Sequence, residues 1–177
     1  MPTGVFGRLW SGDMAWTLQR PAARVVLLDS QSRVFLMRAS DPVNPQKLPW
    51  WEIPGGGLDP GEDFVDCARR ELWEEAGFFD VEMGPCIWTQ QVSFEFAGLW
   101  FDSSEQIFVA WAKDGGQWAP QRLEMLEAAA FIEARWWSLE ELLASKEKVL
   151  PERLREFLPD VVAGKLPDAP IDISPVV

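Results

Sequence analysis

The chain contains no histidine and no tyrosine among its 177 residues. Without histidine, the sequence excludes a histidine general base, Ser-His-Asp and Cys-His catalytic arrangements, and zinc sites that require imidazole. Catalysis would therefore have to use carboxylates, lysine, arginine, thiols, hydroxyls or a metal ion. Cysteine is also scarce, and Cys67 and Cys86 lack the spacing of a C-x-x-C motif. We expect two reduced thiols rather than a disulfide framework.

Long apolar runs and a targeting segment are absent from the sequence as well. No stretch of about 18 apolar residues occurs, and a membrane-spanning helix needs about that length. The start of the chain lacks a basic region followed by an apolar one, which is the pattern of a secretory signal. We therefore expect a cytoplasmic protein without a membrane partner.

Positive charge is in short supply: 16 Lys and Arg residues oppose 28 Asp and Glu residues, so the formal net charge is −12. This balance disfavours nucleic acid as a partner, because proteins bind nucleic acid by neutralising its phosphates with Lys and Arg. A small phosphorylated ligand stays compatible with the composition, since a bound metal ion can supply positive charge locally.

The residues that are present indicate one folded domain. Apolar residues make up 47% of the chain and charged residues 25%, which is typical of globular proteins. A chain of 177 residues is long enough for one substantial core and short for two. We expect a single domain at 1–177, with an N-terminal arm at 1–19 and an extended C-terminal tail at 165–177.

The order of the expected elements indicates the fold class. Aliphatic and β-branched runs predict a hairpin over 22–39, and a short strand at 50–53 leads through a glycine-rich loop into a helix at about 63–76. Strand-like runs follow up to residue 112, and two later helices are expected, one with Ser138 as its N-cap and one over 151–163. This order predicts an α/β (α+β) fold in which a mixed β-sheet lies between helices.

The central helix carries a cluster of acidic residues near its C-terminal end. Because successive helical residues are 100° apart, Glu71, Glu74 and Glu75 share one arc. Like charges at these spacings repel by a few tenths of a kcal/mol per pair, and acids near a helix C-terminus oppose its dipole by roughly 0.3 to 1 kcal/mol. A solvated helix face with intrahelical ion pairs is one explanation. A bound cation that compensates for the repulsion is the other.

The segment around this cluster, "GGLDPGEDFVDCARRELWEEAGF" at 56–78, resembles the Nudix box of MutT-like Nudix hydrolases. The box consists of Gly, five residues, Glu, seven residues, Arg-Glu, an aliphatic residue, any residue, Glu-Glu, any residue, Gly and an apolar residue. All nine specified positions are occupied, by Gly56, Glu62, Arg70, Glu71, Leu72, Glu74, Glu75, Gly77 and Phe78. The resemblance implies the Nudix fold, an α/β/α sandwich. It also implies divalent-cation-dependent hydrolysis of a nucleoside diphosphate linked to another moiety.

The resemblance also implies roles for individual residues. Glu71, Glu74 and Glu75 are expected to bind Mg²⁺ or Mn²⁺, ions that prefer hard oxygen ligands. Arg70 is expected to orient the site through ion pairs with Glu74 and Glu62, and Gly56 and Gly77 have structural roles.

The sequence does not decide whether the general base lies in the box or in a distant loop. Within the box the candidates are Glu71 and Glu74. Outside it Glu127 is the first choice and Glu105 the second, although each of these two could be a plain surface acid.

Candidates for substrate contacts are weaker. Gly55 and Gly57 would let the loop pass close to a ligand. Trp51 and Phe94, together with Trp50 and Trp100, could stack on a nucleobase, although core or dimer packing is the alternative for each.

Three functions compete at this stage. The first is a pyrophosphohydrolase acting on a small nucleotide substrate. The second is a non-catalytic Nudix domain that binds or senses a nucleotide, which a degraded box would favour. The third is an RNA 5′-end pyrophosphohydrolase, which the acidic composition disfavours. A homodimer is possible in each case.

Overall fold

The computed structural model describes residues 17–113 and 116–176. Within them, nine strands form one mixed sheet in the order β8-β3-β2-β1-β6-β5-β9, with β4 beside β1 and β7 beside β2. The strands are β1 (Thr17–Leu28), β2 (Val34–Ala39), β3 (Trp50–Glu52), β4 (Gly55–Gly57), β5 (Val81–Phe96), β6 (Leu99–Ala112), β7 (Phe131–Trp137), β8 (Val149–Leu150) and β9 (Ile171–Asp172). The helices are α1 (Phe64–Glu71) with its π-helical continuation η1 (Leu72–Ala76), α2 (Met125–Ala130), α3 (Leu139–Ala144) and α4 (Leu154–Val162).

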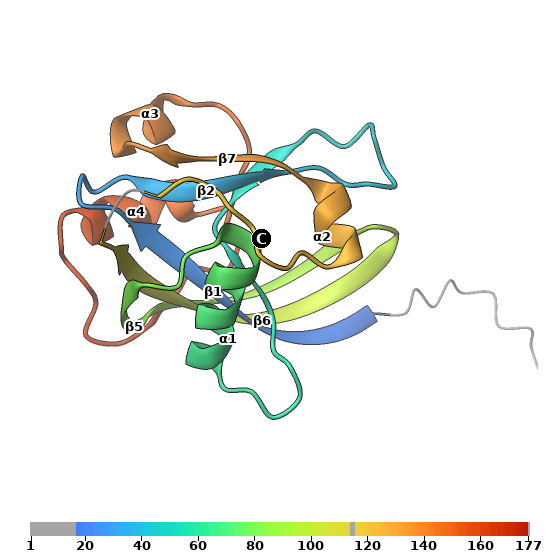
Figure 1. The fold of residues 1–177 in the computed structure, drawn as a ribbon, viewed down its shortest axis with the longest axis horizontal. Coiled ribbons are helices and arrows are strands. Elements are labelled where there is room, and N and C mark those ends of the chain that lie inside the picture. Colours follow the sequence, from blue (N-terminus) through green and yellow to red (C-terminus); the bar gives the residue numbers. More distant parts are fainter. Residues whose placement is uncertain (1–16, 114–115, 177) are drawn as a thin grey trace, which may run out of the picture.

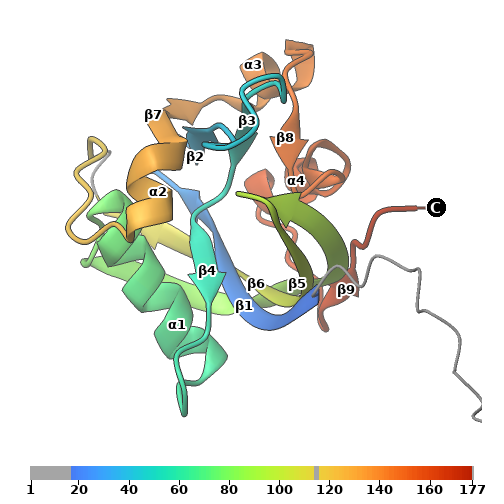
Figure 2. The same ribbon diagram turned by 90° about the vertical axis from the view of Figure 1, so that its right-hand side faces the viewer.

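Helices cover both faces of the curled sheet, with β1 at its centre (Figures 1 and 2). β1 pairs antiparallel with β2 and β4, and parallel with β6. Its side chains alternate between two cores, as the two-residue period of a strand requires. Val25 and Leu27 pack in the core that includes Ala68 and Leu72 of the central helix. Val26 belongs to the other core, which includes residues of α3 and α4. The predicted sandwich of a mixed sheet between helices is confirmed.

The central helix begins and ends close to the predicted residues. Asp63 is its N-cap, and the Asp63 side chain accepts a hydrogen bond from the backbone N–H of Asp66. Gly77 ends it with a left-handed φ of 84°, which favours glycine. The last turn is π-helical rather than α-helical. A π-turn is wider than an α-turn and changes the directions of the side chains it carries.

Several boundaries differ from the sequence-based expectation. Residues 55–57, expected as loop, form β4 because their backbone pairs with β1. The strand-like runs between residues 79 and 96 join into the single long strand β5, which accommodates two register shifts against β6. The final helix begins at Leu154 rather than at Pro151.

The two ends of the chain were also the subject of predictions. The predicted N-terminal arm lies outside the described residues except for 17–19, which already belong to β1. In the predicted extended tail, β9 pairs parallel with β5, and Ile173 is completely buried. No helix in the described part of the chain has both the length and the apolar character to cross a lipid bilayer.

Candidate active site and metal centre

At β4, the strand backbone lies in contact with acidic side chains of the central helix. The backbone N–H of Gly55 donates a hydrogen bond of 2.9 Å to Glu75 Oε2. A Cβ placed on Gly56 would lie only 2.6 Å from Glu71 Oε1. Any side chain at this position would therefore displace the Glu71 carboxylate. The close packing between strand and helix therefore requires glycine at position 56, whereas Gly55 and Gly57 lie close to residues of β1.

A compact acidic cluster consists of Glu71, Glu75 and Glu127. Each residue offers one carboxylate oxygen, and the three oxygens lie within 4.8 Å of one another. Glu71 and Glu75 are only 4% and 2% exposed. Two members come from the Nudix-like segment, whereas Glu127 comes from α2, more than fifty positions later in the chain. We refer to these three residues as the acidic trio.

Burial and mutual repulsion shift the protonation of the acidic trio. Burial raises the pKa of Glu71 to about 7, although Arg70 opposes the shift, and Glu127 adds to it. Burial and the charge of Glu71 raise the pKa of Glu75 well above its usual value. Burial also raises the pKa of Glu127. Three carboxylates so close together need either protons or a cation, and hard oxygen donors at this spacing could hold Mg²⁺ or Mn²⁺.

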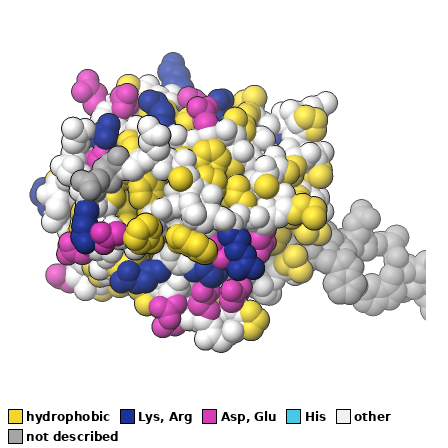
Figure 3. All heavy atoms as spheres, in the orientation of Figure 1, with side chains coloured by type: hydrophobic (Ala, Val, Ile, Leu, Met, Phe, Trp, Pro, Cys, Tyr) yellow, Lys and Arg dark blue, Asp and Glu magenta, His cyan; other side chains and the backbone are white. Residues whose placement is uncertain are grey.

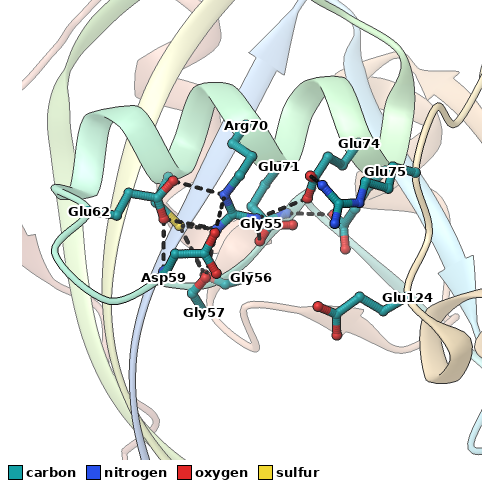
Figure 4. A network of polar contacts seen from close by, with 12 residues as sticks. Gly55, Gly56, Gly57, Asp59, Glu62, Arg70, Glu71, Glu74, Glu75 and Glu124 are labelled. Atoms are coloured by element: carbon teal, nitrogen blue, oxygen red, sulfur yellow. Dashed lines mark hydrogen bonds and ion pairs between the residues drawn. The ribbon is translucent and has the colours of Figure 1, made fainter.

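Arg70 joins the acidic residues into one network (Figure 4). Its Nε and Nη2 donate to the two carboxylate oxygens of Glu62 at 2.8 and 2.9 Å, and Nη2 also donates to the Gly57 carbonyl at 2.9 Å. Its Nη1 donates to Glu71 at 2.8 Å and to Glu74 at 3.0 Å. The hydrogen bonds from Arg70 lower the pKa of Glu62 to about 2, against the effect of partial burial. The expected ion pairs of Arg70 with Glu62 and Glu74 are therefore present.

Glu74 does not join the acidic trio. One oxygen of its carboxylate pairs with Arg70 at 3.0 Å, and the other lies 3.7 Å from Arg122 Nη1. The expected common arc assumed an α-helix, but Glu74 and Glu75 lie in the π-helical turn η1. Two arginines and the wider turn thus separate Glu74 from Glu71 and Glu75. A metal-binding or catalytic role of Glu74 stays a prediction.

The loop before α2 positions Glu127 beside the central helix. Trp118 Nε1 donates to the Glu75 carbonyl at 2.7 Å, and the backbone N–H of Ala119 donates to the Ala76 carbonyl at 3.1 Å. Gly77 permits this contact, because a Cβ there would lie 2.1 Å from the Ala119 carbonyl oxygen. At the start of α2, the backbone N–H of Glu124 donates to Glu127 Oε2 at 2.8 Å.

Glu105 lies in a separate buried network. Its carboxylate accepts hydrogen bonds from Arg24 at 2.8 Å, Gln90 at 2.6 Å and Ser103 at 3.0 Å. Burial alone would raise its pKa, but Arg24 and the other donors hold the pKa below its usual value. These contacts fit a structural anion. Its expected role as a general base stays a prediction without geometric support. Arg24 was missed in the sequence analysis, although a cation within the apolar run "AARVVLL" was a visible signal.

A cleft of about 280 Å³ is lined by Glu75 and Glu127 and also by aromatic residues. Trp50 and Phe96 are two of these, and their rings meet edge to face at 6.4 Å. Phe94 also lines the cleft, and its contact with a substrate stays a prediction. Trp51 does not line the cleft: it is 3% exposed and packs edge to face on Trp137 at 5.1 Å in the core. Neighbouring strand residues point to opposite faces, so the structure directs Trp50 to the cleft and Trp51 away from it.

Comparison with known proteins is consistent with this geometry. A family model described as NUDIX domain matches residues 18–161. The chain is 44% identical over 64 residues to a protein of Caulobacter vibrioides named RNA pyrophosphohydrolase, covering 36% of each chain. It thus spans about a third of the length of that curated relative. A protein of the same name from Wolbachia pipientis is 23% identical over 171 residues, covering 85% of this chain and 95% of the relative. The solved MutT protein from Methanosarcina mazei Go1 has a similar fold, with a TM-score of 0.60 at 20% identity over 84% of this chain and 96% of that one.

Proposed function

The chain belongs to the Nudix family, and from this membership we propose that it is a divalent-cation-dependent pyrophosphohydrolase. Its reaction is the hydrolysis of a phosphoric anhydride bond in a small nucleotide, a nucleoside diphosphate linked to another moiety. The single observation that carries the proposal is the acidic trio: Glu71 and Glu75 are buried against β4, and Glu75 and Glu127 line the cleft.

Glu71 and Glu75 of the acidic trio are the proposed ligands of the cation, Mg²⁺ or Mn²⁺. Their raised pKa values support this assignment, because a cation would offset the repulsion that otherwise favours protonation. When bound, the cation would polarise a phosphate oxygen and lower the pKa of a bound water. Arg70 holds the Glu71 carboxylate in position through the bond from Nη1.

Glu127 is the proposed general base. Its carboxylate lies beside those of Glu71 and Glu75 and lines the cleft. A raised pKa brings a carboxylate closer to the range in which it accepts a proton efficiently near neutral pH. The other candidates are less available in this geometry, since Glu74 pairs with two arginines. Glu105 accepts three hydrogen bonds.

A small nucleotide suits the cleft better than an RNA strand. The aromatic rings of Trp50, Phe94 and Phe96 offer surfaces on which a nucleobase can stack. Acidic and basic side chains are interspersed over the face seen in Figure 3, which differs from the continuous basic strip that an RNA backbone requires. Location in the cytoplasm and dimerisation stay predictions.

An RNA 5′ end is the second candidate substrate. Relatives aligned to this chain carry the name RNA pyrophosphohydrolase, and a 5′-triphosphate contains the same phosphoric anhydride bonds. A non-catalytic nucleotide-binding domain is less favoured, because every specified position of the box is occupied.

The test is a screen for release of phosphate and pyrophosphate with Mg²⁺ or Mn²⁺. Its substrates are nucleoside triphosphates, oxidised nucleotides, nucleotide sugars, ADP-ribose, dinucleoside polyphosphates and a 5′-triphosphate RNA oligonucleotide. We expect turnover of a small nucleotide that Glu75→Gln lowers at least about 100-fold. The matched control is Glu82→Gln, an exposed glutamate on β5. Turnover of the RNA alone would select the second candidate, and tight nucleotide binding without any turnover would indicate a binding domain.

A further inference from the structure

Four cationic side chains line the cleft, and they differ in their partners. Arg24 pairs with Glu105 at 2.8 Å, and Lys47 pairs with Asp41 at 3.5 Å and donates to the Glu95 carbonyl at 2.6 Å. Lys148 is exposed. Arg20 is partly buried, yet within residues 17–113 and 116–176 its guanidinium has no hydrogen-bond acceptor and no carboxylate within ion-pair distance.

The position of Arg20 is set by the surrounding structure. It precedes Pro21 in β1, and its carbonyl accepts a hydrogen bond from the Ser103 hydroxyl at 3.2 Å. Its guanidinium lies 5.7 Å from the centroid of the Phe101 ring, and Phe101 stacks in turn on Phe94 at 5.3 Å. An aromatic platform that holds a guanidinium by its face leaves the N–H groups at its edge free to bind a ligand.

Arg20 also lies next to the elements that form the acidic trio. A Cβ placed on Gly57 would lie 2.9 Å from Arg20 Nε, whereas one on Gly56 would lie 2.6 Å from Glu71 Oε1. Arg20 and Glu71 therefore flank β4 on its two sides. The positive charge of Arg20 also acts on Glu127, where it partly opposes the rise in pKa that burial causes.

We propose that Arg20 is a substrate-binding residue that holds a phosphate group next to the acidic trio. Five N–H donors in a planar fork match the oxygens of a phosphate in two parallel hydrogen bonds. Arg20 is partly buried, is supported by an aromatic ring and has no carboxylate partner within the described residues. These features are those of a side chain available to bind an anionic ligand. This inference rests on the proposed function, because it takes the acidic trio as the place where the diphosphate binds.

The test measures binding of inorganic pyrophosphate in the presence of Mg²⁺ by isothermal titration calorimetry. Arg20→Gln is expected to raise the dissociation constant about 10- to 100-fold, the loss typical of a charge-assisted bidentate contact. Arg20→Lys, which keeps the charge without the fork, should fall between Arg20→Gln and the unmodified protein. The matched control is Arg69→Gln, an exposed arginine on α1 outside the cleft, which should bind pyrophosphate as the unmodified protein does.

A titration with Mn²⁺ alone separates phosphate binding from a purely electrostatic role. If Arg20 only neutralises Glu127, Arg20→Gln will tighten Mn²⁺ binding and leave pyrophosphate binding unchanged, and the inference is then wrong. Equal pyrophosphate affinity of both Arg20 variants and the unmodified protein would also overturn it while leaving the proposed function intact. If the unmodified protein binds no pyrophosphate and cleaves no substrate, the proposed function fails as well.

Discussion

Removal of the Arg70 guanidinium provides a demanding test of the acidic network. In Arg70→Met, the side chain keeps much of its apolar volume but loses its bonds to Glu62, Glu71, Glu74 and the Gly57 carbonyl. The side chains of Glu62, Glu71 and Glu74 are 14%, 6% and 13% exposed, and that of Arg70 is 22% exposed. Removing one partner of such a buried group typically costs about 3 to 5 kcal/mol, because the remaining charges stay buried without a counter-ion.

The loss in Arg70→Met should depend on pH. Arg70 holds down the pKa of Glu71, which is nevertheless about 7, so without Arg70 that carboxyl will bind a proton more tightly still. At about pH 6 a proton can replace the arginine, whereas at about pH 8.5 the carboxylate must stay charged or the protein must unfold. We therefore expect the full loss of about 3 to 5 kcal/mol at the higher pH and a smaller loss at the lower pH.

Urea unfolding followed by tryptophan fluorescence in EDTA measures this free energy directly, since the chain contains 11 Trp. Arg69→Met is the matched control on the same helix, because Arg69 is exposed. It should change the free energy of unfolding by no more than about 0.5 kcal/mol. A loss below about 1 kcal/mol for Arg70→Met at pH 8.5, or an equal loss for both variants, would refute the reasoning.

Three further predictions concern the same site. Gly56→Ala places a methyl group 2.6 Å from Glu71 Oε1. The affinity for Mn²⁺, measured by calorimetry, should therefore fall at least about tenfold. An unchanged affinity would contradict the proposed ligand set. In Gly77→Ala, the new Cβ would sit on a backbone with a φ of 84° and lie 2.1 Å from the Ala119 carbonyl oxygen. The substitution should therefore lower the free energy of unfolding by more than about 1 kcal/mol. Equal urea midpoints of variant and unmodified protein would show that the loop can shift without cost. In EDTA, the thermal midpoint should fall as pH rises from about 4.5 to about 7, because the folded protein holds the Glu71 proton more tightly than the unfolded chain. Glu71→Gln should flatten this slope, and a midpoint that rises through this window would contradict the raised pKa.

Local features of the fold followed from the sequence because short-range geometry specifies them. The bounds of the central helix, predicted at about 63–76, and the N-cap Ser138 were predicted correctly. Each depends on backbone groups within a few residues. The pairing of Arg70 with Glu62 was predicted as well, since both lie on one short segment and the box fixes their spacing.

Features that depend on side-chain direction were harder to predict from the sequence. The sequence offered Trp50 and Trp51 as equivalent aromatic candidates, and only the register of β3 against β2 decides which one faces the cleft. Likewise, an α-helical wheel places Glu74 with Glu71, but the π-helical turn and Arg122 draw its carboxylate away.

The sequence by itself therefore determined the family, the order of the main elements and two members of the acidic trio, Glu71 and Glu75. All of these follow from fixed spacings along the chain. Only the tertiary structure decided that Glu127 completes the trio and that Glu105 forms an ion pair with Arg24. It also decided that Arg20 lies against β4 without a carboxylate partner among the described residues. These contacts join residues tens of positions apart, and strand register, loop docking and burial set them rather than any local period of the sequence.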